Sequence, residues 1–167
     1  PEHVIDAAAQ VMGDFDLDPA SCENANRIVN ALKFYTVEDN GLEQPWTGRV
    51  WLNPPYDAVG PWVEKLIAEY EAGNVTEAVL LVNANTETRW FEKLWKFSIC
   101  FVRGRLKFWN PEKANAVGAP HGNAVIYVGA FPERFSAEFQ KLGTVYAVKA
   151  GQAAWREISN YQPEVRI

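Results

Sequence analysis

The chain alternates short apolar runs with stretches whose apolar residues recur at helical spacing, and this alternation restricts its fold more than any other feature. The run Ala78–Val82 is apolar at every position, which is typical of a strand buried on both faces of a sheet. Residues 2–12 show helical spacing instead, with apolar side chains at Val4, Ile5, Ala8, Val11 and Met12. Strands that alternate with helices predict the α/β class, with a mostly parallel sheet between two helical layers.

The other expected elements follow the same alternation. Strands are predicted at residues 15–17, 49–52, 99–102, 124–128 and 145–148, and helices at 21–32 with Ser21 as N-cap, 62–73, 90–95 and 133–141. Residues 33–48 are predicted to form a loop with a turn at Asn40-Gly41. Because the last strands lie close together in the sequence, we expect antiparallel pairing at the C-terminal edge of the sheet. One domain is expected over residues 1–150, with a tail at 151–167.

The composition narrows the class of protein. Of the 167 residues, 48% are hydrophobic and 22% are charged, which is typical of a globular domain and excludes a disordered chain. No apolar run approaches the ~20 residues of a membrane span, and the N-terminus does not resemble a secretory signal, so we expect a cytoplasmic protein without a membrane partner. Cys22 and Cys100 form neither a disulfide framework nor a zinc site, and His3 and His121 are not spaced as metal ligands, so we expect no metal.

The net charge of −5 is unevenly distributed along the chain. Residues 1–77 hold 14 acidic and 4 basic side chains, whereas residues 78–167 hold 7 and 12. Within residues 89–113, Glu92 and Glu112 oppose a larger basic group, which comprises Arg89, Lys93, Lys96, Arg103, Arg105, Lys107 and Lys113. An acidic half and a basic half favour two ligands of opposite charge. A solvated surface of uneven charge would explain the same pattern.

Two polar segments that contain proline follow predicted strands. They are Asp18-Pro19-Ala20-Ser21 and Asn53-Pro54-Pro55-Tyr56. In open α/β sheets, ligands bind at the carboxyl ends of the strands, so we expect both segments to face one crevice.

The residues of Asn53-Pro54-Pro55-Tyr56 suit chemistry on an exocyclic amine such as that of adenine. The Asn53 side-chain oxygen can accept a hydrogen bond from one N–H of such an amine. The Pro54 carbonyl can accept from the other N–H, because the prolines prevent the strand from continuing. Tyr56 can stack on the ring that carries the amine. A stiff connection between strand and helix is the alternative interpretation of the same four residues.

The sequence resembles the phage and prophage type of DNA N-6-adenine methyltransferase, which depends on S-adenosylmethionine. Besides the tetrapeptide at 53–56, the matching stretches run in family order over about residues 1–130. They are Pro1-Glu2, Asp16 to Ser21, Phe34-Tyr35-Thr36, Asp39-Asn40-Gly41-Leu42, Trp46, Thr86 to Phe91 and Arg103 to Phe108. The resemblance implies a Rossmann-like fold with three α/β/α layers, S-adenosylmethionine as cofactor, and double-stranded DNA with a flipped adenine as substrate.

The resemblance also implies roles for individual residues. Asp18, Pro19, Ala20 and Ser21 would form the first cofactor motif, and Asp39 would bind the cofactor's ribose or adenine. Residues Asn53, Pro54, Pro55 and Tyr56 would form the catalytic loop, with Asn53 also near the cofactor. Phe108 or Trp109 would cover the second face of the flipped base, and an aromatic strand end in the core is the alternative for both. DNA contacts are expected from Tyr56, Arg89, Arg103, Arg105, Lys107, Phe108 and Trp109.

Other functions remain open from the sequence. The acceptor could instead be cytosine N4 or a protein glutamine. The same tetrapeptide occurs in glutamine methyltransferases, because the side-chain amide of glutamine presents the same pair of N–H groups. A DNA-binding relative without catalysis is the remaining alternative, because Ala20-Ser21 stands where methyltransferases commonly carry Gly-x-Gly.

Overall fold

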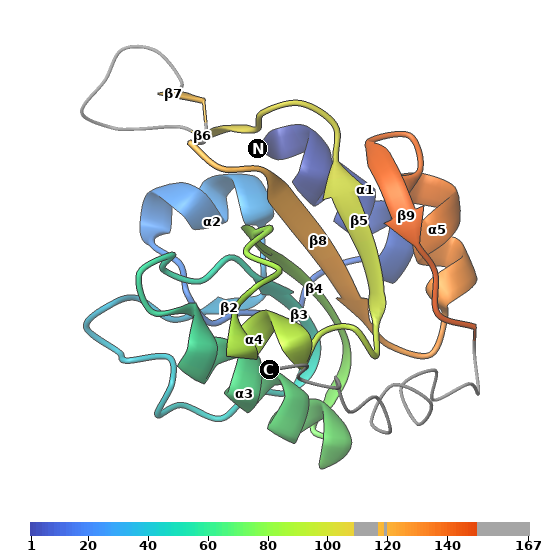
Figure 1. Cartoon of the computed structure of the whole chain (residues 1–167). Coiled ribbons are helices and arrows are strands. Elements are labelled where there is room, and N and C mark those ends of the chain that lie inside the picture. Colours follow the sequence, from blue (N-terminus) through green and yellow to red (C-terminus); the bar gives the residue numbers. More distant parts are fainter. Residues whose placement is uncertain (109–116, 119, 150–167) are drawn as a thin grey trace, which may run out of the picture.

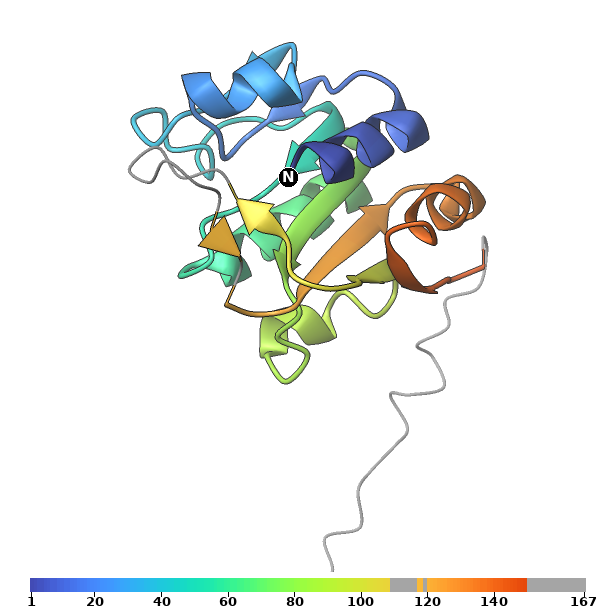
Figure 2. The same cartoon turned by 90° about the horizontal axis from the view of Figure 1, so that it is seen from above.

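A mixed seven-stranded sheet forms the centre of the computed structural model, which describes residues 1–108, 117–118 and 120–149 (Figure 1). The strand order is β2-β1-β3-β4-β8-β5-β9. These strands are β1 (Leu17–Asp18), β2 (Lys33–Phe34), β3 (Gly48–Leu52), β4 (Val75–Asn83), β5 (Ser98–Val102), β8 (Asn123–Val128) and β9 (Gly143–Tyr146). A separate pair joins β6 (Lys107–Phe108) to β7 (Val117–Gly118), and Figure 2 shows it beside the sheet.

The sheet is parallel in its N-terminal half and antiparallel in its C-terminal half. Strands β2, β1, β3 and β4 pair in parallel, while β8 is antiparallel to both of its neighbours, β4 and β5. The last strand, β9, is antiparallel to β5. The antiparallel pairing is therefore present but not confined to the edge, because β8 lies inside the sheet. In the described residues between β5 and β8 the structure contains the short strands β6 and β7 and no helix, and an antiparallel partner needs no helical crossover.

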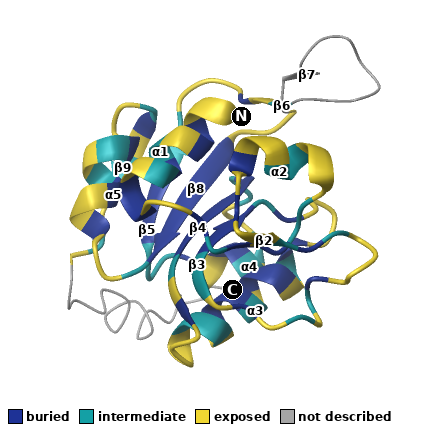
Figure 3. Ribbon diagram, turned by 180° about the vertical axis from the view of Figure 1, so that it is seen from behind, coloured by how far each residue is buried: buried dark blue, intermediate teal, exposed yellow. Residues whose placement is uncertain are grey.

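Helices cover both faces of the sheet. They are α1 (Glu2–Met12), α2 (Glu23–Val29), α3 (Val59–Glu71), α4 (Arg89–Glu92) and α5 (Pro132–Phe139). Figure 1 looks onto the face with α3 and α4, and Figure 3 onto the face with α1 and α5, whose inward sides are buried. None of the helices in the described ranges is long and apolar enough to cross a bilayer.

The two faces of β4 belong to two apolar cores. Leu80 and Val82 pack in the cluster that holds Trp62 of α3 and Phe91 of α4. Leu81 packs in the other cluster, with side chains of α1 and α5. The prediction that the run 78–82 is buried on both faces is therefore confirmed.

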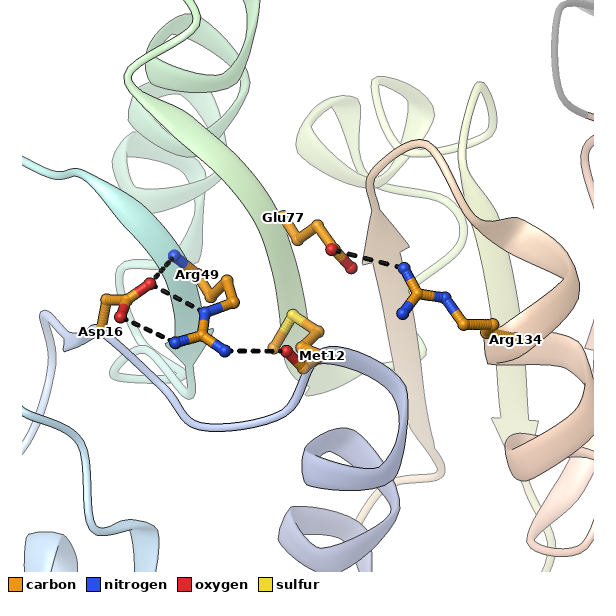
Figure 4. Close-up of polar contacts among 5 residues, drawn as sticks. All are labelled: Met12, Asp16, Arg49, Glu77 and Arg134. Atoms are coloured by element: carbon orange, nitrogen blue, oxygen red, sulfur yellow. Dashed lines mark hydrogen bonds and ion pairs between the residues drawn. The ribbon is translucent and has the colours of Figure 1, made fainter.

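A charged network ties the amino ends of the strands, at the edge away from the predicted crevice. Arg49 donates from Nε to Asp16 Oδ2 (2.9 Å) and from Nη2 to Asp16 Oδ1 (3.0 Å), and its Nη1 reaches the Met12 carbonyl (3.2 Å; Figure 4). Glu77 and Arg134 form a longer ion pair nearby, at 3.6 Å. The contacts of Arg49 join the end of α1, the start of β1 and the start of β3, and so fix the amino edge of the sheet.

Several predicted boundaries differ from the structure. The region expected to be a loop contains β2, since Lys33 and Phe34 pair with Leu17 and Asp18. The N-cap of α2 is Cys22, whose sulfur accepts from the Ala25 N–H at 3.4 Å, and not Ser21. Helix α4 is a single turn that ends at Glu92, although the aromatic spacing continues to Trp95. The predicted tail at 151–167 lies outside the described residues.

Candidate functional site

A small cavity lies where the carboxyl ends of β1, β2 and β3 meet. Its volume is about 170 Å³. Its lining comes from the three segments that follow these strands and from helix α3, and it consists of Pro19, Ala20, Ser21, Thr36, Val37, Asn40, Gly41, Pro55 and Trp62. The structure therefore brings Pro19–Ser21, the loop after β2 and Pro55 to one place, and Asp18 directly precedes the first of these segments.

Asp18 is a buried carboxyl at the end of β1. Only 2% of its surface is exposed, and its Oδ1 accepts a hydrogen bond from the Ala20 N–H at 3.2 Å. Burial raises the pKa of Asp18 to about 6, against the opposing effect of hydrogen bonds from Ser21 and Ala20. A cation or a strong hydrogen-bond donor beside such a buried carboxyl would stabilise its ionised form.

Gly41 fixes the distance between the two loops that line the cavity. A Cβ at this position would overlap the Pro19 carbonyl oxygen and lie 3.2 Å from the ring of Trp62. The Gly41 carbonyl accepts from the Trp46 indole N–H at 2.8 Å, and Trp46 stacks on Trp62 with ring centroids 5.9 Å apart. The loop is thus held against the Pro19 backbone by a buried aromatic pair.

Asp39 is not among the residues that line this cavity, unlike the predicted cofactor residues at 19–21. Its Oδ2 accepts from the Thr36 N–H at 2.8 Å and from the Thr36 hydroxyl at 2.9 Å. These bonds lower the pKa of Asp39 and close the turn that follows β2. From this loop the cavity is lined instead by Thr36, Val37, Asn40 and Gly41. A contact between Asp39 and a cofactor stays a prediction.

Asn53 places a polar atom in a buried position directly after β3. Its Oδ1 is buried and has no hydrogen-bond partner among the residues that the structure describes. An unpaired buried oxygen is costly, so its presence points to a ligand that supplies a donor. Pro54 is buried and the Pro55 carbonyl accepts from the Ala58 N–H at 3.2 Å, which leads the chain into α3.

Tyr56, three residues after Asn53, is in ring contact with Phe108. Their ring centroids are 5.9 Å apart and the ring planes are nearly perpendicular, at 88°. Tyr56 is 36% exposed, so part of its ring is free to contact a ligand. The structure therefore brings Phe108 to the tetrapeptide that the sequence singled out. Trp109, the other predicted aromatic, lies outside the described residues.

The predicted basic residues fall into different places. Arg103, Arg105 and Lys107 are exposed on the segment that leads into and through β6, and Arg105 donates to the Pro120 carbonyl at 2.9 Å. Arg89 lies elsewhere, in a groove of about 600 Å³ between α3 and α4 that Glu71 and Trp95 also line.

Two lysines of the basic stretch at residues 89–113 form ion pairs with acidic side chains, which the sequence did not indicate. Lys93 pairs with Glu64 and Lys96 with Glu71, and both carboxylates come from α3. Acidic residues distant in the sequence therefore neutralise part of the charge at residues 89–113.

Sequence reasoning missed Trp62 and Asn40 as lining residues of the cavity. Trp62 was part of an apolar helical stripe, and such a stripe does not show which of its members reaches a cavity. In the described parts of the chain, no group of three or more His, Cys, Asp or Glu side chains is arranged to hold a metal ion.

Comparisons with known proteins identify the family of this sequence. The family model for DNA N-6-adenine-methyltransferase (Dam) matches residues 1–152. A protein of Haemophilus phage HP1 (strain HP1c1) named DNA N-6-adenine-methyltransferase is 34% identical over 102 residues, which cover 59% of this chain and 57% of that protein. A protein of the same name from Escherichia phage T1 is 31% identical over 147 residues, which cover 77% of this chain and 60% of that protein.

The chain spans a little under two thirds of the length of these two relatives. The family match, by contrast, extends over nearly all of the chain and includes every residue around the cavity and the tetrapeptide. The chain therefore belongs to the DNA N-6-adenine-methyltransferase (Dam) family.

Proposed function

We propose that this chain transfers a methyl group from S-adenosylmethionine to the N6 amine of an adenine in DNA. The observation that carries the proposal is the buried Oδ1 of Asn53, which has no partner among the residues that the structure describes and follows a strand whose next residues reach a cavity at Pro55. Family membership and the names of the two phage relatives support the same activity. In this proposal residues 1–150 form a Rossmann-like methyltransferase domain with three α/β/α layers.

The cavity beside Asp18 is the proposed cofactor site. S-adenosylmethionine supplies an electrophilic methyl group on a sulfonium, and it also carries an ammonium group and ribose hydroxyls. The buried Asp18 carboxylate favours such cationic and donor groups, and Pro55 and Trp62 offer apolar surface to the adenine ring. A volume of about 170 Å³ accommodates part of this molecule, so the remainder would extend toward Asn53.

In the proposed reaction, Asn53 prepares the amine for attack. Its Oδ1 accepts one N–H of the adenine amine and the Pro54 carbonyl accepts the other, which draws the nitrogen lone pair out of conjugation with the ring. The N–C bond forms as the C–S bond breaks, the sulfur keeps the electron pair, and the product amine releases one proton to solvent. Tyr56 stacks on the ring and fixes its angle, so that positioning supplies much of the rate.

DNA would approach from the side of β6. Arg103, Arg105 and Lys107 are exposed there and would contact phosphates, while Phe108 contacts Tyr56 and would cover the flipped base. Arg89 lies in a different groove, so its contact with DNA would be to a more distant phosphate. The substrate would be bacterial or phage DNA in the host cytoplasm.

Tritium transfer from labelled S-adenosylmethionine to unmethylated genomic DNA tests this proposal, with nucleoside analysis of the product. Asn53→Ala should lower kcat by about 10²–10³, the usual cost of one preorganised hydrogen-bonding group. Asn53→Asp should retain part of the activity, because a carboxylate still accepts hydrogen bonds. Asn74→Ala is the matched control, since Asn74 lies at the opposite edge and its amide donates to Glu69.

Each alternative gives a different result in the same assay. N4-methylcytosine as the product, or label in protein alone, would replace adenine as the substrate. Calorimetry that detects no cofactor binding would indicate a DNA-binding relative without catalysis. Full activity in Asn53→Ala would refute the role of this amide.

A further inference from the structure

A second buried amide oxygen that has no partner in the described part of the chain lies at the same edge of the sheet as Asn53. Asn83 ends β4 and Asn123 begins β8, and the two residues are partners in the strand register. They are 8% and 2% exposed. Asn123 Nδ2 donates to the Val82 carbonyl (3.4 Å) and to Asn83 Oδ1 (3.3 Å), which fixes the orientation of its amide. Asn123 Oδ1 finds no hydrogen-bond partner within the described ranges.

Strand alternation puts the amides of Asn83 and Asn123 on one face of the sheet, and Asn53 directly follows the last residue of β3. Side chains two residues apart in a strand share a face. Trp51, Leu81 and Val125, which stand two residues from these three asparagines, all belong to the cluster beneath α1 and α5. Asn53 and Asn123, whose side-chain oxygens have no partner among the described residues, therefore lie at one edge of the sheet, with β4 between their strands.

The position of Asn123 indicates which substrate it serves. The proposed cofactor cavity lies on the β1 and β2 side of Asn53, whereas Asn123 lies on the opposite side, beyond β4. Phe108 packs against the same cluster as Trp51 and also contacts Tyr56. A base held at Asn53 and Tyr56 would therefore extend over β4 toward Asn123, away from the cofactor.

From this placement we infer that Asn123, held by Asn83, binds the methyl-accepting base through one ordered water molecule. The inference rests on the proposed function. The base offers N–H donors only on its exocyclic amine, and Asn53 and the Pro54 carbonyl use both. The oxygen of Asn123 therefore receives its donor from a water, which gives one hydrogen to Asn123 Oδ1 and the other to a ring nitrogen beside the amine. A polar, buried pair of amides is the kind of site that retains such a water.

Variants of Asn123 test this inference. Asn123→Leu keeps the approximate size and removes the acceptor, so kcat/KM for DNA should fall about tenfold, mainly through KM. The dissociation constant of S-adenosylmethionine, measured by calorimetry, should stay within about twofold. Asn123→Asp keeps an acceptor and should retain more activity than Asn123→Leu. Ser98→Ala is the control for removing a buried polar group of the same sheet, because Ser98 is equally buried but lies on β5.

Base analogues give a readout that a purely structural role of Asn123 would not change. The methylated sites are first mapped by sequencing, and synthetic duplexes then carry 1-deazaadenine or 7-deazaadenine at one such site. Each analogue lacks one of the two ring nitrogens beside the amine. The difference between the wild type and Asn123→Leu should vanish on one of the two duplexes. If it persists on both, or if Asn123→Leu has wild-type KM, the inference is wrong.

These results are separable from failure of the proposed function itself. That function fails if the wild type neither binds S-adenosylmethionine nor methylates DNA. The present inference fails if the wild type is active and depends on Asn53, while Asn123 variants behave like Ser98→Ala. If Asn123→Leu does not fold, the comparison of Asn123→Asp with the wild type on the two analogues decides the outcome.

Discussion

Gly41 and Pro19 are in backbone contact, and no side chain larger than hydrogen fits between them. The two residues belong to different loops, which follow β2 and β1, and both line the same cavity. Their contact allows the two loops to approach more closely than they could with a side chain at position 41. The sequence marks Asn40-Gly41 as a turn, but the requirement for glycine comes from the neighbouring chain segment.

The first prediction concerns this contact. Gly41→Ala should force the loop away from Pro19, because the new Cβ would overlap the Pro19 carbonyl oxygen. Overpacking of this kind costs about 1–3 kcal/mol in stability. Cofactor affinity should fall by at least about tenfold, measured by calorimetry alongside thermal unfolding.

Gly60→Ala is the matched control for that variant. Gly60 lies within α3, where a Cβ would meet only the Trp90 Cβ at 3.9 Å, so the added methyl has room. Alanine in a helix is about 0.5–1 kcal/mol more favourable than glycine, and this variant should be slightly more stable than the wild type. Equal cofactor affinity in Gly41→Ala and the wild type would contradict the role given to the loop contact.

The second prediction concerns pH and Asp18. Burial raises the pKa of Asp18 to about 6, so the folded state favours the protonated carboxyl. The stability that this protonated form contributes is fully present below the unfolded pKa of 3.8 and is lost as the pH rises through 6. A cationic ligand favours the ionised carboxylate. Cofactor binding should therefore strengthen between pH 5 and pH 7, by up to about tenfold per pH unit below the pKa. Calorimetry over this range should show a flat profile for Asp18→Asn, and a flat profile for the wild type would refute the assignment.

The third prediction concerns the salt dependence of DNA binding. Arg103, Arg105 and Lys107 are exposed and carry no salt bridge among the described residues. Replacing all three by Ala should flatten the slope of log K against log salt by about 0.9 for each phosphate that is no longer neutralised. Fluorescence anisotropy with labelled duplex DNA measures this slope. The double variant of Lys93 and Lys96 should change it much less, because both lysines are paired with α3; the reverse order of effects would place the DNA on the α3 and α4 face.

The fourth prediction concerns the amino edge of the sheet. Arg49→Met removes two hydrogen bonds to the Asp16 carboxylate. Because the side chains of Arg49 and Asp16 are each about one-third exposed, the free energy of unfolding should fall by only about 1–2 kcal/mol. The Arg49 guanidinium lowers the pKa of Asp16, so this contribution is present above the unfolded pKa of 3.8 and is lost as the pH falls through the folded value. Urea unfolding at pH 7 and pH 3 measures both effects. Arg134→Met breaks the longer pair with Glu77 and should lower the free energy of unfolding by less than about 0.5 kcal/mol. If Arg134→Met and Arg49→Met lowered it equally, the two-bond geometry of the Arg49–Asp16 contact would not add to stability.

Periodicity predicted the long, strongly patterned elements well. The helix at 2–12 and the core strands at 49–52, 78–82, 99–102 and 124–128 are present within a few residues. Short elements were missed or misplaced because tertiary contacts decide them. Strand β2 consists of two residues held by β1, and α4 ends where Leu94 must pack into the core.

The sequence indicated only part of the candidate site, because contacts between distant segments decide the rest. Strand ends followed by proline pointed to residues 18–21 and 53–56, and the structure places Pro19 to Ser21 with Pro55 around one cavity. The orientation of Asp39 toward Thr36, and the pairing of Lys93 and Lys96 with α3, depend on contacts between distant segments. Asn83 and Asn123 are 40 positions apart and become neighbours only through the antiparallel pairing of β4 with β8.

The internal position of β8 also sets the order in which the sheet can form during synthesis. Strands β1 to β4 can all pair with one another once Asn83 has left the ribosome. Strand β5 has no partner at that stage, because both of its neighbours, β8 and β9, follow it in the chain. At about 5–20 residues per second, β5 emerges seconds before Val128 completes β8. During that interval β4 and β5 each present an unpaired apolar edge, which is the feature that promotes association between chains. The strand that carries Asn123 is therefore also the one that covers the apolar edges of β4 and β5 in a nascent chain.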